Sequence, residues 1–290
     1  MKVLVTGVGG QLGYDVCKVL SSRKIDHVGV DRKDFDITNE QATHDYIVNY
    51  HPDAVIHCSA WTAVDRAEDE LEMVKAVNTE GPRNIAKACR EIGAKMLYIS
   101  TDYVFPGDGD CFYEPEDPTG PLGAYGATKL GGELAVRELL DRYYIVRISW
   151  VFGINGNNFV KTMLRLAETK TELNVVCDQI GSPTYTADLA PLLCDMIETE
   201  KYGIYHATNE GVCSWAEFAE EIFKIAGKRV TVHHIPTSEY PTRAVRPLNS
   251  RMSKDKLEQM GFHRLPTWQD ALKRYMAVLS EVNHQQCGKL

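Results

Sequence analysis

The sequence predicts an α/β protein built on a doubly wound parallel sheet, with a smaller C-terminal lobe interleaved with it. Through the first half, short runs rich in Val, Ile and Tyr alternate with longer amphipathic segments. The runs are continuously apolar, as expected for strands covered on both faces. Beyond about residue 152 the alternation loosens into polar, turn-rich segments. A sheet of this kind binds ligands beyond the carboxyl ends of its strands.

The expected elements follow one another in chain order. The strands are predicted at 2–6, 27–31, 54–58, 96–101 and 144–151, and the helices at 11–22, 40–50, 68–92 and 124–143. Residues 188–199 and 203–207 are expected to return to the main sheet. In the last third, Ser214-Trp215-Ala216-Glu217 and Thr267-Trp268-Gln269-Asp270 resemble capping boxes that open two further helices.

Composition limits the classes of partner. The 290 residues are 44% hydrophobic, enough for a substantial core, and the net charge of −8 without a basic block argues against nucleic acid and anionic membranes. Eight cysteines without a CxxC pair indicate reduced thiols in the cytoplasm. The N-terminal apolar run is too short for a signal peptide, and no segment is expected to span a bilayer. The histidines lack partners at ligand spacing, so we expect no metal. The oligomeric state stays open, a homodimer included.

A glycine loop follows the first expected strand and opens the first expected helix. Gly7, Gly10 and Gly13 are spaced three and three, whereas the commoner dinucleotide fingerprint is spaced two and three. Without Cβ atoms the chain can turn tightly and bring backbone N–H groups against a pyrophosphate. Asp31 ends the second strand, where a carboxylate accepts hydrogen bonds from the adenosine ribose, which favours NAD(H). Arg32 and Lys33 follow and could hold a 2′-phosphate, so NADH or NADPH is expected.

The loop and its context predict the domain organisation. We assign residues 1–152 to a Rossmann-type dinucleotide-binding domain whose sheet is completed by about 173–210. Residues 153–172 and 211–290 are assigned mainly to a substrate-binding lobe. No internal repeat or low-complexity segment is evident.

Tyr125 and Lys129 indicate the chemistry. Their i, i+4 spacing places them on one face of a helix. A phenol has a pKa of about 10, and a nearby ammonium favours its ionised form. Thr101 ends the fourth expected strand, where its hydroxyl could hydrogen-bond a carbonyl oxygen. The YxxxK pattern alone is weak, but behind a glycine loop and a Ser-Thr strand end it predicts reduction of a carbonyl, with Tyr125, Lys129 and Thr101 as catalytic residues.

Ordered motifs along the chain resemble those of extended short-chain dehydrogenases/reductases acting on nucleotide sugars, and among them the dTDP-4-dehydrorhamnose reductase family of dTDP-rhamnose biosynthesis. The resemblance covers residues 2 to about 279. Its motifs are Gly10-Gln11-Leu12-Gly13, Asp36-Ile37-Thr38, Thr62-Ala63-Val64-Asp65, 100–105, 125–129, Ser149-Trp150, Gly156-Asn157-Asn158-Phe159, 178–185 and Arg246-Pro247. It implies NAD(P)H-dependent reduction of the C4 keto group of dTDP-4-dehydro-L-rhamnose to dTDP-L-rhamnose.

The resemblance also implies a set of contacts. Cofactor contacts are expected from the glycine loop, the second strand end and the following loops: Gly7, Gly10, Gln11, Leu12, Asp31, Asp36, Ile37, Ala60, Trp61, Thr62, Tyr125 and Lys129. Trp61 departs from the Tyr or His more common at its position. Substrate contacts are expected from Thr101, Asp102, Trp150, Asn158 and Arg246. Arg246 would clamp the diphosphate, since guanidinium offers phosphate a bidentate fork. Arg243 is a weaker candidate for this contact.

Other functions are compared with the predicted reductase: two further nucleotide-sugar enzymes and a protein without catalytic activity. Nucleotide-sugar 4,6-dehydratases resemble one another in an Asp-Glu pair after the equivalent of Thr101, and this chain has Asp102-Tyr103. Without the second carboxylate it should not eliminate water. A nucleotide-sugar epimerase of the same fold stays open. So does a non-catalytic regulatory subunit resembling the β subunit of methionine adenosyltransferase.

Overall fold

A six-stranded parallel sheet forms the centre of the computed structural model, which describes residues 1–287, without the side chains of 283–287. The strands lie in the order β10-β5-β4-β3-β1-β2, so the strand order reverses between β1 and β3. Their bounds are β1 Lys2–Thr6, β2 Asp26–Val30, β3 Ala54–His57, β4 Lys95–Thr101, β5 Tyr143–Ile148 and β10 Gly203–His206. The Rossmann-type parallel sheet predicted from the sequence is thereby confirmed.

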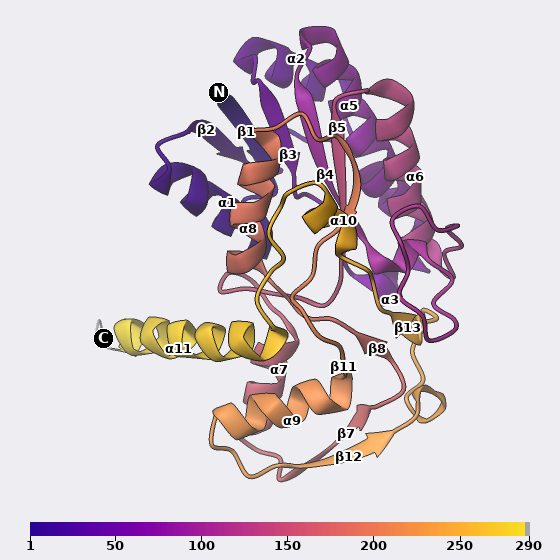
Figure 1. Cartoon of the computed structure of the whole chain (residues 1–290), viewed down its shortest axis with the longest axis vertical. Helices are drawn as coiled ribbons and strands as arrows, with labels where there is room; N and C mark the ends of the chain where they lie inside the picture. The colour runs from indigo at the N-terminus through magenta and orange to yellow at the C-terminus, as the bar shows by residue number, and fades with distance from the viewer. Residues whose placement is uncertain (288–290) are drawn as a thin grey trace.

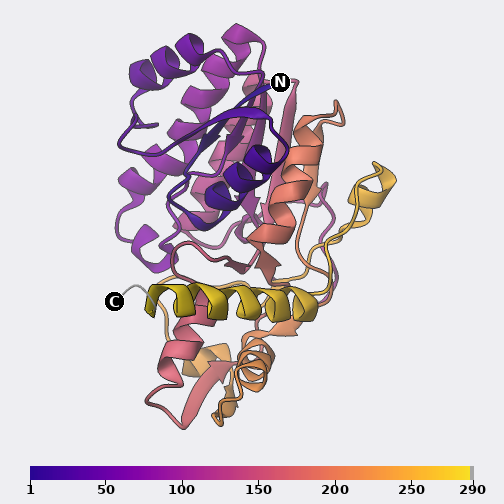
Figure 2. The same ribbon diagram turned by 90° about the vertical axis from the view of Figure 1, so that its left-hand side faces the viewer.

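Helices cover both faces of this sheet (Figures 1 and 2). On one face lie α1 (Gln11–Ser22) and α8 (Thr186–Ile197), and on the other α2 (Glu40–Tyr50), α5 (Gly81–Ile92) and α6 (Ala124–Leu139). Along β1 the side chains alternate between two apolar clusters: Val3 and Val5 pack with α1 and α8, and Leu4 packs on the opposite side. Burial on both faces explains why the strand sequence is continuously apolar.

The segment expected as one helix over 68–92 is divided into three pieces: α4 (Leu71–Lys75), a π-helical turn η1 (Ala76–Glu80) and α5. A further short helix, α3 (Val64–Ala67), precedes it. Pro82 lies in the first turn of α5 and has no N–H to continue the regular ladder, which accounts for the break beside it. The expected helix over 124–143 likewise ends at Leu139, because Tyr143 begins β5.

A third apolar cluster includes side chains of α7 (Phe159–Leu166), α9 (Trp215–Ile225) and α11 (Trp268–Cys287). These three helices lie in the lower part of Figure 1. Strand β7 (Glu172–Val176) pairs with β12 (Thr231–Ile235) and not with the central sheet. Within residues 173–210, β10 therefore adds a strand to the central sheet, and α8 packs on its face. Ser214 and Glu217 form the predicted capping box of α9. The remaining short elements are η2 Asp102–Val104, β6 Val151–Phe152, β8 Ile180–Gly181, β9 Thr184–Tyr185, β11 Cys213–Ser214, η3 Thr237–Glu239, β13 Asn249–Ser250 and α10 Asp255–Gln259.

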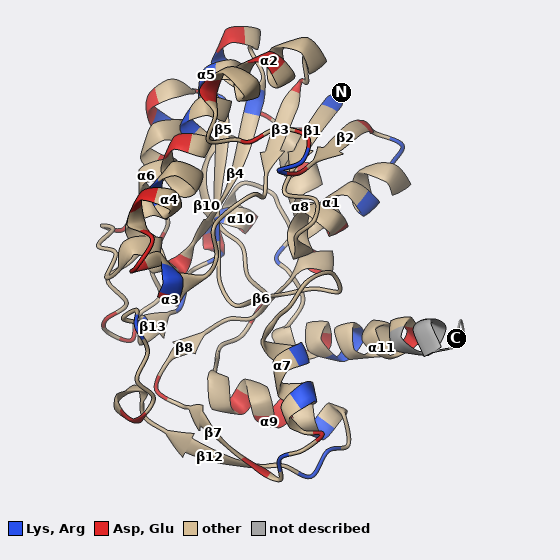
Figure 3. Ribbon diagram, turned by 180° about the vertical axis from the view of Figure 1, so that it is seen from behind, with Lys and Arg blue, Asp and Glu red and all other residues tan. Residues whose placement is uncertain are grey.

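Charged residues of both signs are interspersed over the outer helices, as Figure 3 shows for one side of the molecule. Among the described residues, no helix is long and apolar enough to cross a membrane. The seven cysteines whose side chains are described are free thiols, and Cys287 lies outside that set. Within the same part of the chain, His, Cys, Asp and Glu form no group suited to a metal ion.

Candidate active site

Two adjoining cavities lie at the carboxyl ends of the central strands. The larger, about 670 Å³, contains most of the predicted site: Gly7, Gly10, Gln11, Leu12, Asp31, Ala60, Thr62, Thr101, Asp102, Tyr125, Lys129 and Trp150. The smaller, about 470 Å³, is lined by the predicted adenine-side residues Asp36, Ile37 and Trp61. Asp31 and Ala60 line both. Two cavities that share Asp31 as a lining residue offer separate space for the two halves of a dinucleotide.

The glycine loop brings the start of α1 to the larger cavity. Gly7 has a φ of +73°, and a Cβ there would lie 2.7 Å from the backbone nitrogen of Ser59. A Cβ on Gly13 would lie 2.4 Å from the carbonyl oxygen of Gly7, so this helix packs directly on the loop. Gly10 caps α1 without a side-chain hydrogen bond. The first N–H groups of α1 can therefore bind an anion such as a pyrophosphate.

Asp31 and its neighbours form the wall between the cavities. The Asp31 carboxylate accepts a hydrogen bond from the Lys33 backbone at 3.0 Å, and its side chain is 32% exposed. Arg32 lines the smaller cavity and is 84% exposed, with Asp36 at 3.5 Å. The backbone N–H of Thr38 lowers the pKa of Asp36. Asp31 could accept from ribose hydroxyls and Arg32 could bind a 2′-phosphate, so this wall offers groups for either cofactor.

Tyr125 is a partly buried phenol that lies beside Thr101, at the end of β4, and beside Asp102 and Tyr103 of η2. Burial raises its pKa, the Thr101 hydroxyl lowers it, and Asp102 and Tyr103 raise it further. The Tyr103 ring meets the Tyr125 ring edge-on at 5.3 Å. Tyr125 is therefore held as a neutral phenol, the form that can donate a proton.

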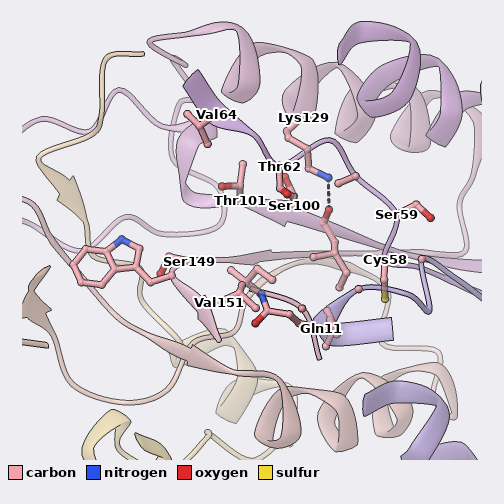
Figure 4. Close-up of a pocket in the computed structure, with 18 of the residues that line it drawn as sticks. Gln11, Cys58, Ser59, Thr62, Val64, Ser100, Thr101, Lys129, Ser149 and Val151 are labelled. Atoms are coloured by element: carbon pink, nitrogen blue, oxygen red, sulfur yellow. Dashed lines mark hydrogen bonds between the residues drawn. The ribbon is translucent and has the colours of Figure 1, made fainter. Parts of the chain in front are cut away.

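Lys129 turns toward the sheet (Figure 4). Its ammonium donates to the carbonyl oxygen of Ile99 at 2.6 Å and lies 4.2 Å from the centre of the Tyr98 ring. Burial lowers the pKa of Lys129 to about 7, while Glu133, one helical turn further, raises it. In the described part of the chain no hydrogen bond joins Lys129 to Tyr125. The i, i+4 spacing brought both residues to one cavity, but the two side chains have different partners.

Asp102 begins η2 directly after Thr101 and is 3% exposed. Its carboxyl group accepts hydrogen bonds from the Thr101 hydroxyl at 2.9 Å and from the Ser250 hydroxyl. Burial raises the pKa of Asp102 to about 6, and these two hydroxyls act in the opposite direction. Ser250 lies in β13, so this carboxyl group links the main sheet to the C-terminal part of the chain.

Two residues expected to contact substrate lie outside the walls of both cavities. Asn158 caps α7, accepting from Lys161 N and donating to Gln11 Oε1 and the carbonyl oxygen of Gly153. Its amide is thus committed to the protein. Arg246 pairs with Asp65 at 2.7 Å and donates to the Tyr103 hydroxyl at 3.2 Å. Arg246 therefore reaches the site through Tyr103 in this structure.

Comparison with known proteins agrees with this geometry. A family model described as "RmlD substrate binding domain" matches residues 1–281. A dTDP-4-dehydrorhamnose reductase of Streptomyces griseus is 43% identical, with 93% of this chain and 91% of the relative covered. The spore coat polysaccharide biosynthesis protein SpsK of Bacillus subtilis is 41% identical, with 95% and 96% covered. The crystal structure of dTDP-4-dehydrorhamnose reductase from Bacillus anthracis in complex with NADP superposes with a TM-score of 0.93 at 43% identity, covering 96% of this chain and 99% of that one.

The chain belongs to the dTDP-4-dehydrorhamnose reductase family.

For this member of the family, the structure adds residues that the sequence did not single out as site residues. Asn78, in η1, accepts from the backbone N–H of Trp61 at 2.8 Å and donates to its carbonyl oxygen at 3.1 Å. Asn78 also donates to Thr128 in α6 at 3.4 Å. It therefore connects the loop between the cavities to the helix of Tyr125 and Lys129. Pro82 was the sequence feature that could have indicated this turn, because it has no N–H to continue the regular helix.

Trp215 is the second addition. It lines the larger cavity from α9, more than 60 residues beyond Trp150, and the two indoles are stacked. The sequence identified Ser214 and Glu217 as the capping box around it, but no spacing rule connects it to the end of β5.

Proposed function

We propose that this dTDP-4-dehydrorhamnose reductase family member reduces the C4 keto group of dTDP-4-dehydro-L-rhamnose to give dTDP-L-rhamnose, using NADH or NADPH. The observation that carries the proposal is the shared cavity: a neutral phenol, Tyr125, and the Thr101 hydroxyl lie in the same space as the uncapped start of α1. The related reductases support the substrate.

The residues present fit a nicotinamide dinucleotide. The start of α1 would hold the pyrophosphate, Asp31 the adenosine ribose, and Asp36, Ile37 and Trp61 the adenine side. When bound, the cofactor supplies the hydride. Glycines at positions 7 and 13 make the close approach of loop and helix possible, because any Cβ there would meet backbone atoms.

Proton transfer is assigned to Tyr125. Its raised pKa keeps the phenol protonated at neutral pH, so the O–H can donate to the oxygen that develops charge at the sugar carbonyl. Thr101 lies beside the phenol, and its single hydroxyl proton is donated to Asp102 in the structure. It would polarise the same carbonyl oxygen by turning this proton from Asp102 to the bound sugar.

Lys129 has an electrostatic role in this scheme. Once Tyr125 has given up its proton, the phenolate is an anion in a buried site, and a cation on the same helix face lowers its free energy. The partners Ile99 and Tyr98 hold the ammonium at the strand ends, beside the cofactor half of the cavity.

The test is a spectrophotometric assay of purified protein with dTDP-4-dehydro-L-rhamnose and each cofactor. Oxidation of NADH or NADPH with formation of dTDP-L-rhamnose is expected. Product analysis covers the alternatives: an isomerised keto sugar without net cofactor consumption would favour the epimerase. Cofactor binding without turnover, together with a co-purifying protein, would favour the regulatory subunit. Either result would refute the proposal.

A further inference from the structure

Trp150 lies where β5 stops and has an unusual backbone. Its φ of +50° is in the left-handed region, which a bulky residue rarely adopts. The next residue begins β6, so the turn at Trp150 separates two strands. Strain of this kind persists only where the surroundings hold it. The contacts around the indole therefore indicate what the strained turn positions.

Two neighbours hold the indole. The Trp215 ring stacks on it with centroids 3.8 Å apart and planes 15° apart. Gly181 of β8 is so close that a Cβ there would lie 2.9 Å from Trp150 Cε2. Trp215 is itself held by Phe159, at 4.6 Å, and by the capping box that opens α9 beside it. The indole of Trp150 is thus packed by elements distant in sequence.

Both indoles line the cavity that contains Tyr125. In the sheet, Ile148 of β5 pairs with Thr101 of β4, so Trp150 follows two residues beyond the register position of Thr101. A sugar with its carbonyl at Thr101 and Tyr125 would have its ring beside this aromatic pair. Indole rings offer apolar contact area at low conformational cost, which suits the C–H groups of a deoxyhexose.

We propose that Trp215 is a positioning residue for the sugar: it stacks on Trp150 and thereby presents that indole as a preformed wall for the hexose. The inference rests on the proposed function for the identity of the sugar. It assigns to α9, which lies outside the main sheet, a part in substrate orientation that acts through Trp150. Cofactor binding, at the opposite end of the cavity, is independent of Trp215.

The experiment compares Trp215→Ala and Trp215→Phe with the wild type. For Trp215→Ala we expect KM for dTDP-4-dehydro-L-rhamnose to rise about tenfold, since a stacked aromatic pair and its ordering effect are lost. Trp215→Phe, which keeps a ring, should recover part of that loss. The dissociation constant of NADH should not change. The exciton couplet that stacked indoles give in far-UV circular dichroism should disappear in both variants.

Gly181→Ala tests the position of the Trp150 indole by changing Gly181, its second neighbour beside Trp215. The added methyl group displaces Trp150 while Trp215 stays intact, so KM should rise and the couplet should weaken. Trp268→Phe is the matched control, because Trp268 packs on Phe218 in the same apolar cluster without lining the cavity. It should lower stability and leave both KM and the couplet unchanged.

Binding of dTDP-L-rhamnose and of dTDP, followed by fluorescence, separates this inference from the proposed function. Weaker binding of dTDP-L-rhamnose to Trp215→Ala, with unchanged binding of dTDP, supports the sugar wall even if turnover is absent. Equal losses for both ligands would overturn it. So would a KM that stays at the wild-type value although the couplet is lost.

Discussion

Asp102 should make the protein less stable as the pH rises. Burial raises the pKa of this carboxyl group from 3.8 to about 6, so the folded state binds its proton more tightly than the unfolded chain does. Its contribution is fully present below about pH 4 and is lost as the pH rises through about 6. A shift of about two units corresponds to about 3 kcal/mol, since one unit is about 1.4 kcal/mol.

The perturbation is Asp102→Asn, which keeps the shape of the side chain and removes its titration. We expect the free energy of unfolding of the wild type, relative to the variant, to fall by about 2 kcal/mol between about pH 4 and about pH 7. Urea unfolding at a series of pH values measures it, and groups other than Asp102 cancel in the difference.

Ser250→Ala provides a second arm of the same experiment. It removes one of the two hydroxyls that lower the pKa of Asp102, so the loss of stability should extend to higher pH than in the wild type. Parallel stability curves for the wild type and Asp102→Asn would refute the assignment of a raised pKa to this carboxyl group.

Three further predictions concern the site. Tyr125→Phe should lower kcat by about 10² to 10⁴, because the proton donor is lost, with NADH affinity unchanged; near-normal turnover would exclude Tyr125 as the donor. Asp31→Ala should weaken NADH binding by about tenfold or more and NADPH binding less, as titration calorimetry can measure; equal effects would mean that Asp31 does not contact the ribose. Asn78→Ala should lower the free energy of unfolding by about 1–3 kcal/mol and weaken NADH binding, since the Trp61 backbone loses both partners; unchanged cofactor affinity would confine Asn78 to a stabilising role.

The main sheet could be predicted closely because its signals are local. Apolar runs bounded by turn residues located β1 to β5, and α1 and α2 have the predicted bounds. The glycine loop and Asp31 could be placed at one edge of the sheet, because all parallel strands present their carboxyl ends there. The strand-end rule and the helix period also predicted that Thr101, Tyr125 and Lys129 lie close together, and the three residues line one cavity in the structure.

The hydrogen-bond partners of the site residues could not be predicted from the sequence. The helix pattern put Lys129 on the face of Tyr125, but Ile99 and Tyr98, from a neighbouring strand, decide where its ammonium lies. Motif position predicts ligand contacts for Asn158 and Arg246, and the structure adds their protein partners Gln11, Asp65 and Tyr103. Such partners lie far apart in sequence, and no periodicity encodes them.

The sequence by itself therefore determined the parallel sheet, the edge of the sheet at which the two cavities lie and the reductase chemistry of the family. These follow from hydrophobic periodicity, strand ends and ordered motifs. Only the tertiary structure decided the protonation of the site and the shape of its substrate end. Burial sets the pKa values of Tyr125, Lys129 and Asp102, and burial is a property of the packed chain. The stacking of Trp215 on Trp150 likewise exists only once α9 has packed against the end of β5.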